Sequence, residues 1–283
     1  MLRADNGLYL VIVCRSEMMR EGAFALIDCL GWKGIWHGTS EIALIEKVSR
    51  IQAEVEEEVK KINLQHLNTS SGPIVAQIRL ISDTVAVSIQ HENDSPPIDS
   101  LKKAYLVRTA ALSVARIQKL FLAEEPRVAL RGCVSYGNHV VVNNFIIGPA
   151  VDEAADYYES ADGAMVWVLP SAGIHSNCGD VLLHDIGSLL ILYNMPLKGG
   201  GQLKSLLINP LYLEASADRR RAIISGFLEA MRRVERLDVW VKGQNTLDFL
   251  EEAESATAHF EEKINSPTWL PVPQSDLTER IEK

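Results

Sequence analysis

The sequence predicts an α+β sandwich, with helices packed on a mostly antiparallel sheet, followed by a helical C-terminal appendage. Strand-like and helix-like segments follow one another as β-α-β-β-α-β-β-α-β, without the regular β-α-β-α alternation of a doubly wound sheet. The 283 residues, 47% of them apolar, suffice for a large domain with an appendage. We expect a domain at 1–171, the appendage at 172–264 packed on the same domain, and an extended tail at 265–283.

The first predicted strand covers residues 23–30 and leads into the turn Gly31-Trp-Lys-Gly34. A helix is expected to begin at Thr39-Ser40-Glu41, because hydroxyl side chains ahead of an acidic residue are typical of a helix N-terminus. Apolar residues then recur at helical spacing to about Leu67.

A hairpin is predicted next, because two β-rich runs, 74–81 and 84–89, flank Ser82-Asp83. The polar segment 90–97 ends in two prolines and indicates a loop. A second helix is expected from about Ser100 to Leu122.

The rest of the predicted domain contains three more strands and a helix. Residues 127–147 are interpreted as two strands around Gly137-Asn138-His139. A helix begins at Gly148-Pro149, since proline is favoured at an early helical position. A short strand is expected at 165–169.

The C-terminal part is less regular. Residues 172–213 carry no clear pattern, and Gly199-Gly200-Gly201 is interpreted as a flexible break. Beyond it, helices are predicted at 217–237 and 246–262, with a strand at 238–241 between them.

Composition narrows the class of protein. The net charge of −9 and pI of about 5.3 argue against a nucleic-acid-binding protein. The four cysteines form no Cys-x-x-Cys pair, so we expect reduced, mostly buried thiols and a cytoplasmic location. The seven histidines lack zinc-ligand spacing, and the apolar run 7–13 is too short to span a membrane. It is not followed by a small-residue cleavage site, so no signal peptide is expected.

Two aspartates suggest a metal site. Asp28 ends the first strand, and Asp83 lies at the hairpin tip. If these strands are neighbours, the two carboxylates repel each other unless a cation lies between them. Oxygen ligands suit Mg²⁺ or Mn²⁺ bound together with substrate phosphates, which the N–H groups of the turn 31–34 can also receive. The alternative is that both are unrelated turn aspartates.

Four motifs, in this order, resemble those of class III nucleotidyl cyclases. Phe24-Ala-Leu-Ile-Asp28-Cys-Leu-Gly31-Trp resembles the first metal motif, and Ile81-Ser82-Asp83 resembles the second. Leu130-Arg131-Gly-Cys-Val-Ser-Tyr-Gly137 is similar to a later strand that ends in glycine. Gly148-Pro-Ala-Val-Asp152-Glu-Ala154 is similar to the Gly-x-x-Val-Asn-x-Ala helix. Together these motifs cover about residues 20–171.

The resemblance implies a class III cyclase-like sandwich and a homodimer with active sites at the subunit interface. It implies two metal ions, Mg²⁺ or Mn²⁺, held by Asp28 and Asp83 with the backbone carbonyl of Cys29. The Arg131-Gly and Gly148-Pro-Ala forms look most like those of the bacterial Pycsar antiphage cyclases, which make cyclic UMP or cyclic CMP. The implied reaction is attack of the ribose 3′-oxygen on the α-phosphorus of a nucleoside triphosphate, releasing pyrophosphate.

The helix motif departs from the family at two positions. The family's ribose-orienting Asn and transition-state Arg are replaced by Asp152 and Asp156. Another cation must substitute, and Arg131 on the neighbouring strand is the candidate; the alternative is a surface salt bridge. The rival function is a catalytically inactive cyclase-like module that binds a nucleotide or a protein, and an unrelated α+β domain is a third alternative.

The base-reading positions also depart from the purine cyclases. Arg79 and Phe145 fall on them, and an arginine donor with a flat ring suits uracil, so UTP is preferred to CTP. Phe145 is alternatively a core residue, and Trp32 either stacks on the base or fills the core. Lys242 lies in Val239-Trp-Val-Lys242-Gly243, which resembles a late family strand whose lysine contacts the triphosphate; alternatively it is a surface lysine.

Overall fold

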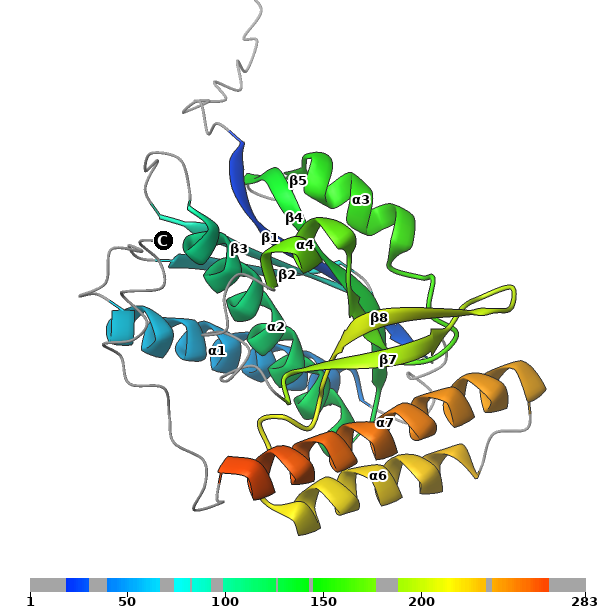
Figure 1. Cartoon of the computed structure of the whole chain (residues 1–283). Coiled ribbons are helices and arrows are strands. Elements are labelled where there is room, and N and C mark those ends of the chain that lie inside the picture. The colour runs from blue at the N-terminus through cyan, green and yellow to red at the C-terminus, as the bar shows by residue number, and fades with distance from the viewer. Residues whose placement is uncertain are drawn as a thin grey trace, which may run out of the picture.

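The computed structural model describes residues 19–30, 40–66, 74–81, 83–92, 99–125, 127–142, 145–176, 188–232 and 236–264. Within them, eight strands form one sheet in the order β2-β3-β1-β4-β6-β8-β7, and β5 pairs with the end of β4 (Figure 1). Only β4 and β6 pair in parallel among the described strands. The mixed α+β fold with a mostly antiparallel sheet is therefore confirmed.

The order of elements through β6 follows the predicted one. The strands are β1 (Arg20–Leu30), β2 (Ile74–Ile81), β3 (Thr84–His91), β4 (Ala129–Val142), β5 (Phe145–Ile147), β6 (Val166–Val168), β7 (Leu190–Pro196) and β8 (Gln202–Ile208). The helices are α1 (Glu41–His66), α2 (Ser100–Ala123), α3 (Pro149–Tyr157), α4 (Pro170–Ser176), α6 (Ala217–Met231) and α7 (Leu237–Ile264).

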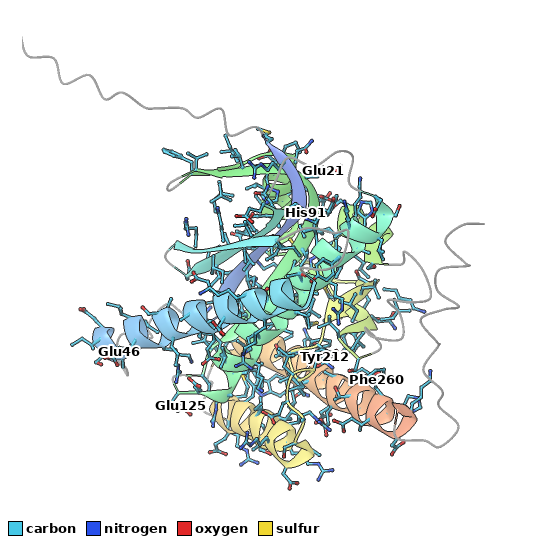
Figure 2. All side chains as sticks on the ribbon, turned by 90° about the vertical axis from the view of Figure 1, so that its left-hand side faces the viewer. Glu21, Glu46, His91, Glu125, Tyr212 and Phe260 are labelled. Atoms are coloured by element: carbon cyan, nitrogen blue, oxygen red, sulfur yellow. The ribbon has the colours of Figure 1, made fainter. Side chains whose placement is uncertain are left out.

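The two faces of the sheet carry separate cores, because side chains alternate along each strand. Ala23, Ala25 and Ile27 of β1 belong to the core that α1 and α2 cover. Phe24 belongs to the opposite core, together with residues of α3, α6 and α7. Figure 2 shows α1 lying across the molecule with Glu46 on it, and this glutamate is exposed.

The predicted break at Gly137-Asn138-His139 is wrong. β4 continues to Val142, with Gly137 paired opposite Gly22 of β1. His139 is fully buried, and its Nε2 lies 2.8 Å from Ser88 Oγ. A polar triplet that looks like a turn is thus held in a strand, because the neighbouring strands satisfy its backbone and its imidazole.

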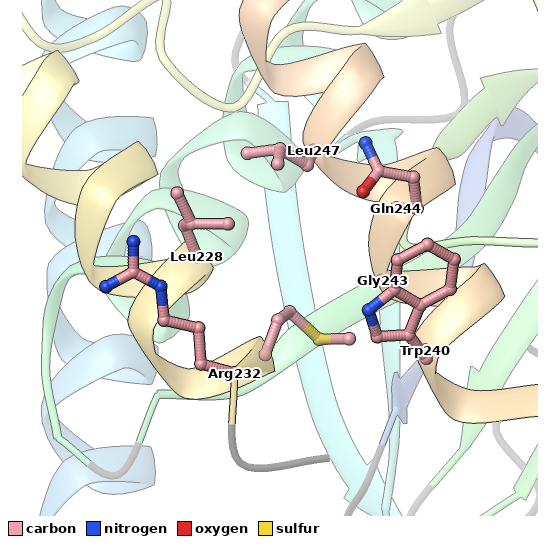
Figure 3. A pocket seen from close by; sticks show the side chains of 7 residues that line it. Leu228, Arg232, Trp240, Gly243, Gln244 and Leu247 are labelled. Carbon is pink, nitrogen blue, oxygen red and sulfur yellow. The ribbon is translucent and has the colours of Figure 1, made fainter. Parts of the chain in front are cut away.

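The predicted strand at 238–241 is also wrong, because this segment forms the first turns of α7. Gly243 explains the helix packing: a Cβ there would lie 1.8 Å from Met231 Cε, so the methionine of α6 rests directly on the glycine. Figure 3 shows Gly243 with Leu228, Trp240 and other residues lining a cavity of about 60 Å³ between the two helices. Packing against α6 therefore outweighs the β-propensity of Val239-Trp-Val241.

The residues after 172 continue the same sheet. β8 pairs with β6 at Leu207 and Trp167, and α6 and α7 lie side by side next to β7 and β8 (Figure 1). Gly199, Gly200 and Gly201 form the turn between β7 and β8, with φ of 88°, 101° and 85°. Because only glycine adopts such angles readily, this triplet is a defined turn and not the predicted break.

Other predictions concern thiols and membranes. Cys29 and Cys133 are buried free thiols, as predicted, and Cys14 and Cys178 lie outside the described residues. Among the helices that the structure describes, none is long and apolar enough to cross a membrane.

Candidate functional site

Of the two predicted metal-binding aspartates, Asp28 lies in β1 and Asp83 lies in the turn that leads into the adjacent strand β3. Asp28 is in register with Thr84, the residue that follows Asp83, in the antiparallel pair β1–β3. The backbone N–H of Cys29 donates to the carbonyl oxygen of Asp83 at 2.9 Å. The hairpin tip is thus bonded to the end of β1, which is the neighbouring arrangement that the sequence required.

Asp28 lies in a partly desolvated position. Burial has the largest effect on its pKa and raises it, whereas the hydrogen bond and the charge of Arg131 lower it. The negative charge of Asp83 raises the pKa further, so the two carboxylates interact electrostatically. This repulsion is the physical reason to expect a cation beside them.

Arg131 supplies a cation at this place. It is in register with Asp28 on the pair β1–β4, and its Nε and Nη2 donate to Asp28 Oδ2 at 3.2 and 2.9 Å. The same Nη2 lies 3.3 Å from Oε1 of Glu159. Only 8% of the Arg131 side chain and 13% of the Asp28 side chain are exposed, so this is a buried ion pair and the surface salt bridge is the wrong alternative.

Three residues of this cluster were missed by the sequence analysis. Glu159, just after α3, accepts hydrogen bonds from Tyr158 Oη at 3.2 Å and from Lys198 Nζ at the turn after β7. The Lys198 hydrogen bond is the main reason that the pKa of Glu159 is lowered. No local motif marks these residues, because only the fold brings positions 28, 131, 159 and 198 together.

The donor set fits a divalent cation bound mainly through its substrate. Mg²⁺ is commonly held by one or two protein carboxylates together with phosphate oxygens of the substrate. Asp28 and Asp83 can provide the two carboxylates. In the described part of the chain, no group of three or more His, Cys, Asp or Glu residues is arranged to hold a metal. The Cys29 thiol is buried and burial raises its pKa, so its backbone carbonyl is the only ligand it can offer. Gly31 and Trp32 lie outside the described residues.

The two aspartates of α3 do not face the sheet. Asp152 and Asp156 are exposed, whereas Ala150 and Ala154 of the same helix are buried. Ser135 Oγ of β4 donates to the carbonyl oxygen of Ala150 at 2.6 Å and fixes this orientation. Asp152 is therefore accessible to a ligand that approaches from outside the subunit.

The two predicted base-reading residues lie far apart in one chain. Arg79 is on β2, two strands from β1 and so about 10 Å away, and its Nη1 donates to Ile78 O at 3.0 Å. Phe145 on β5 is 71% exposed, so the core alternative is wrong. It pairs with Val142, and β4 runs about 35 Å from Arg131 to that residue.

Lys242 lies on α7 and not on a strand. With Asp162, Arg236 and other residues it lines an open cavity of about 570 Å³ at the beginning of that helix. The resemblance to a late family strand therefore fails at the level of secondary structure, and any contact with a triphosphate would be made from a helix.

No protein-family model matches the chain, and no curated protein matches it in sequence. Solved structures with a partly similar chain path include the catalytic core of a rhodopsin-guanylyl cyclase with converted specificity in complex with ATPαS. That structure has 12% identity and a TM-score of 0.43, and the match covers 68% of this chain and 97% of the other.

Two further solved structures are similar. The guanylyl cyclase Cya2 has 11% identity and a TM-score of 0.36, with 67% of this chain and 91% of the other covered. An adenylate/guanylate cyclase/hydrolase from Silicibacter pomeroyi has 14% identity and a TM-score of 0.38, with 67% and 96% covered. Identities and scores this low do not bear on activity, which has to be argued from the cluster around Asp28.

Proposed function

We propose that the chain is a metal-dependent nucleotidyl cyclase that converts a nucleoside triphosphate to its 3′,5′-cyclic monophosphate and pyrophosphate. The observation that carries the proposal is the meeting of Asp28 and Asp83 at one end of adjacent strands, with the buried guanidinium of Arg131 beside them. The ordered cyclase-like motifs across residues 20–171 support the same chemistry.

The residues have distinct roles in this proposal. Mg²⁺ or Mn²⁺, held by Asp28, Asp83 and the Cys29 carbonyl, would supply Lewis-acid activation of the ribose 3′-hydroxyl and of the α-phosphate. The 3′-hydroxyl loses its proton to solvent water and its oxygen forms a bond to the α-phosphorus, while the bond from the α-phosphorus to the bridging oxygen breaks and pyrophosphate leaves. Arg131 donates hydrogen bonds toward the negative charge that develops on the phosphoryl oxygens. The family's arginine for this role is absent, because position 156 is an aspartate.

A second subunit completes the site in this proposal. Phe145 and Asp152 are exposed in the single chain, so both can face the substrate of a partner copy in a homodimer. Asp152 would accept a hydrogen bond from a ribose hydroxyl. Gly31, Trp32 and Lys242 are proposed to contact the nucleotide as well.

The preferred base is uracil, followed by cytosine. Arg79 can donate two hydrogen bonds and accept none, which suits the carbonyl oxygens of uracil. Formation of a cyclic pyrimidine nucleotide as a cytoplasmic antiphage signal belongs to this proposal through the motif resemblance alone.

A non-catalytic nucleotide-binding or protein-binding module is the second candidate. The contact between Arg131 and Asp28 favours it, because a guanidinium already neutralises one of the two carboxylates. The replacement of the family's Asn and Arg by Asp152 and Asp156 points the same way.

One experiment separates the two candidates. The protein is incubated with each of the four ribonucleoside triphosphates and Mn²⁺, and products are identified by mass spectrometry. A cyclic nucleotide with pyrophosphate, absent with Asp83→Asn, supports the cyclase. Nucleotide binding without product at any concentration supports the non-catalytic module.

A further inference from the structure

We propose that Arg131 is a built-in competitor for the divalent cation at Asp28, and that Glu159 retains Arg131 when a cation binds. The inference rests on the proposed function, because it concerns the metal site of the same reaction. In this view Arg131 limits the binding of a cation at Asp28, and Glu159 is a positioning residue for Arg131.

The competition follows from the atoms involved. Both hydrogen bonds from Arg131, through Nε and Nη2, go to Oδ2 of Asp28. A divalent cation that takes this oxygen must displace two charge-assisted donors from it. Because the pair is largely buried, water does little to weaken it, so the displacement has a cost that an exposed pair would not impose.

Glu159 lowers that cost. Its Oε1 lies 3.3 Å from the same Arg131 Nη2, so the guanidinium already has a second acceptor within reach. Lys198 and Tyr158 hydrogen-bond to this carboxylate, which holds it in position even though 46% of its side chain is exposed. An arginine released by Asp28 thus remains paired, and the unpaired buried charge that makes breaking such pairs costly does not arise.

Mn²⁺ binding without nucleotide tests the proposal, measured as the loss of the free-ion signal in electron paramagnetic resonance. The wild type is compared with Arg131→Gln, Glu159→Gln and the double variant. We expect Arg131→Gln to tighten Mn²⁺ binding about tenfold, because the charged hydrogen bonds that compete with the ion are removed. Glu159→Gln should weaken it about threefold, because Arg131 then has Asp28 as its only carboxylate partner in the cluster.

The double variant separates retention of Arg131 from simple loss of negative charge. If Glu159 acts through Arg131, Glu159→Gln has no effect in the Arg131→Gln background. If it acts only through its charge, it weakens Mn²⁺ binding equally in both backgrounds, and the proposal is overturned. Asp156→Asn, which removes an exposed charge from α3, the helix that ends just before Glu159, is the matched control and should leave Mn²⁺ affinity unchanged.

Two outcomes distinguish this inference from the proposed function. Mn²⁺ affinity that is equal in the wild type and all variants overturns the competition but leaves the cyclase open to its product assay. Failure of every variant, Arg131→Gln included, to bind Mn²⁺ without nucleotide overturns the competition, and absence of a cyclic product with all four nucleotides overturns the proposed function. Should Arg131→Gln not fold by circular dichroism, Arg131→Lys, which cannot form the paired hydrogen bonds, is expected to tighten binding less but in the same direction.

Discussion

Asp28 and Arg131 face each other directly across the central strands β1 and β4 and form a buried ion pair. A buried pair of this kind constrains both partners, because removal of one leaves a charge without its counter-ion in a poorly solvated place. The pair therefore links the stability of the sheet to the chemistry proposed at this end of the central strands.

Variants of the two aspartates should separate the effect on stability from the effect on activity. Asp28→Asn and Asp83→Asn are both expected to abolish cyclic-nucleotide formation, because each removes a proposed metal ligand. Asp28→Asn should also lower the free energy of unfolding by about 1–3 kcal/mol, since Arg131 loses its closer partner. Asp83→Asn should change it by less than about 0.5 kcal/mol, because Asp83 makes no ion pair within the described residues. Urea unfolding and the product assay measure the two quantities. Full activity of either variant would contradict the metal assignment.

Arg79→Ala tests the reading of the base. We expect the wild type to turn over UTP faster than ATP, and the variant to narrow this difference mainly by a lower rate with UTP. An unpaired donor facing the wrong base costs about 1–3 kcal/mol, which corresponds to roughly a 5- to 150-fold preference. The measurement is kcat/KM with both nucleotides. A ratio that the mutation does not change would remove Arg79 from base recognition.

Phe145→Ala is the companion variant. Because Phe145 of β5 pairs with the end of β4 that is far from Arg131 in the same chain, it affects the ratio of UTP to ATP turnover only if a partner subunit supplies it. Size-exclusion chromatography of the protein establishes whether such a partner is present. A monomer that is nevertheless active would contradict the shared site.

His139 should make stability depend on pH. Burial lowers its pKa, and its ring nitrogens face Ser88 Oγ at 2.8 Å and Gly137 O at 3.1 Å. The folded state therefore binds fewer protons than the unfolded state just below the ordinary histidine pKa of about 6.5. The contribution of His139 to the free energy of unfolding is complete above this pH. It falls as the pH drops from about 6.5 toward the lowered pKa, by at most about 1.4 kcal/mol per pH unit.

Urea unfolding between pH 8 and pH 5 checks this effect. The slope of the unfolding free energy against pH should be shallower in His139→Gln than in the wild type, although other histidines also contribute. Equal slopes would mean that the pKa of His139 is the same in the folded and unfolded states.

Arg220 of α6 should stabilise the packing of α6 against α7. Its side chain is fully buried; Nη1 and Nη2 donate to the two oxygens of Glu261 at 2.8 and 2.9 Å, and Nη1 also donates to Glu214 O. Arg220→Met is expected to lower the free energy of unfolding by about 3–5 kcal/mol, because it leaves partly buried carboxylates without their counter-ion.

The adjacent Arg221 provides the control. Its side chain is 70% exposed and, among the residues that the structure describes, its ion pair is a 3.8 Å contact with Asp218. Arg221→Met should change stability by less than about 0.5 kcal/mol. Similar unfolding midpoints for the two variants would show that the buried network contributes little.

The sequence alone determined those features that arise from local patterns. Ser40 Oγ accepts from the N–H of Ala43 at 3.2 Å at the start of α1, as expected of a hydroxyl cap. The alternation of apolar residues fixed the hairpin β2–β3, and with it the place of Asp83. Asp28 and Asp83 could be matched in advance through the motif resemblance, whereas the adjacency of β1 and β3 came from the structure.

Only the tertiary structure decided the features that depend on partners distant in sequence. Gly137-Asn138-His139 remains a strand because β1 and β3 satisfy it, and 238–241 is helical because α6 packs on Gly243. Likewise, the sequence offered Arg131 as a candidate cation, but its burial and its link to Glu159 and Lys198 come from the juxtaposition of β4, α3 and the β7–β8 turn. Local propensities amount to a fraction of the free energy that burial and paired charges contribute, so these contacts overrule them.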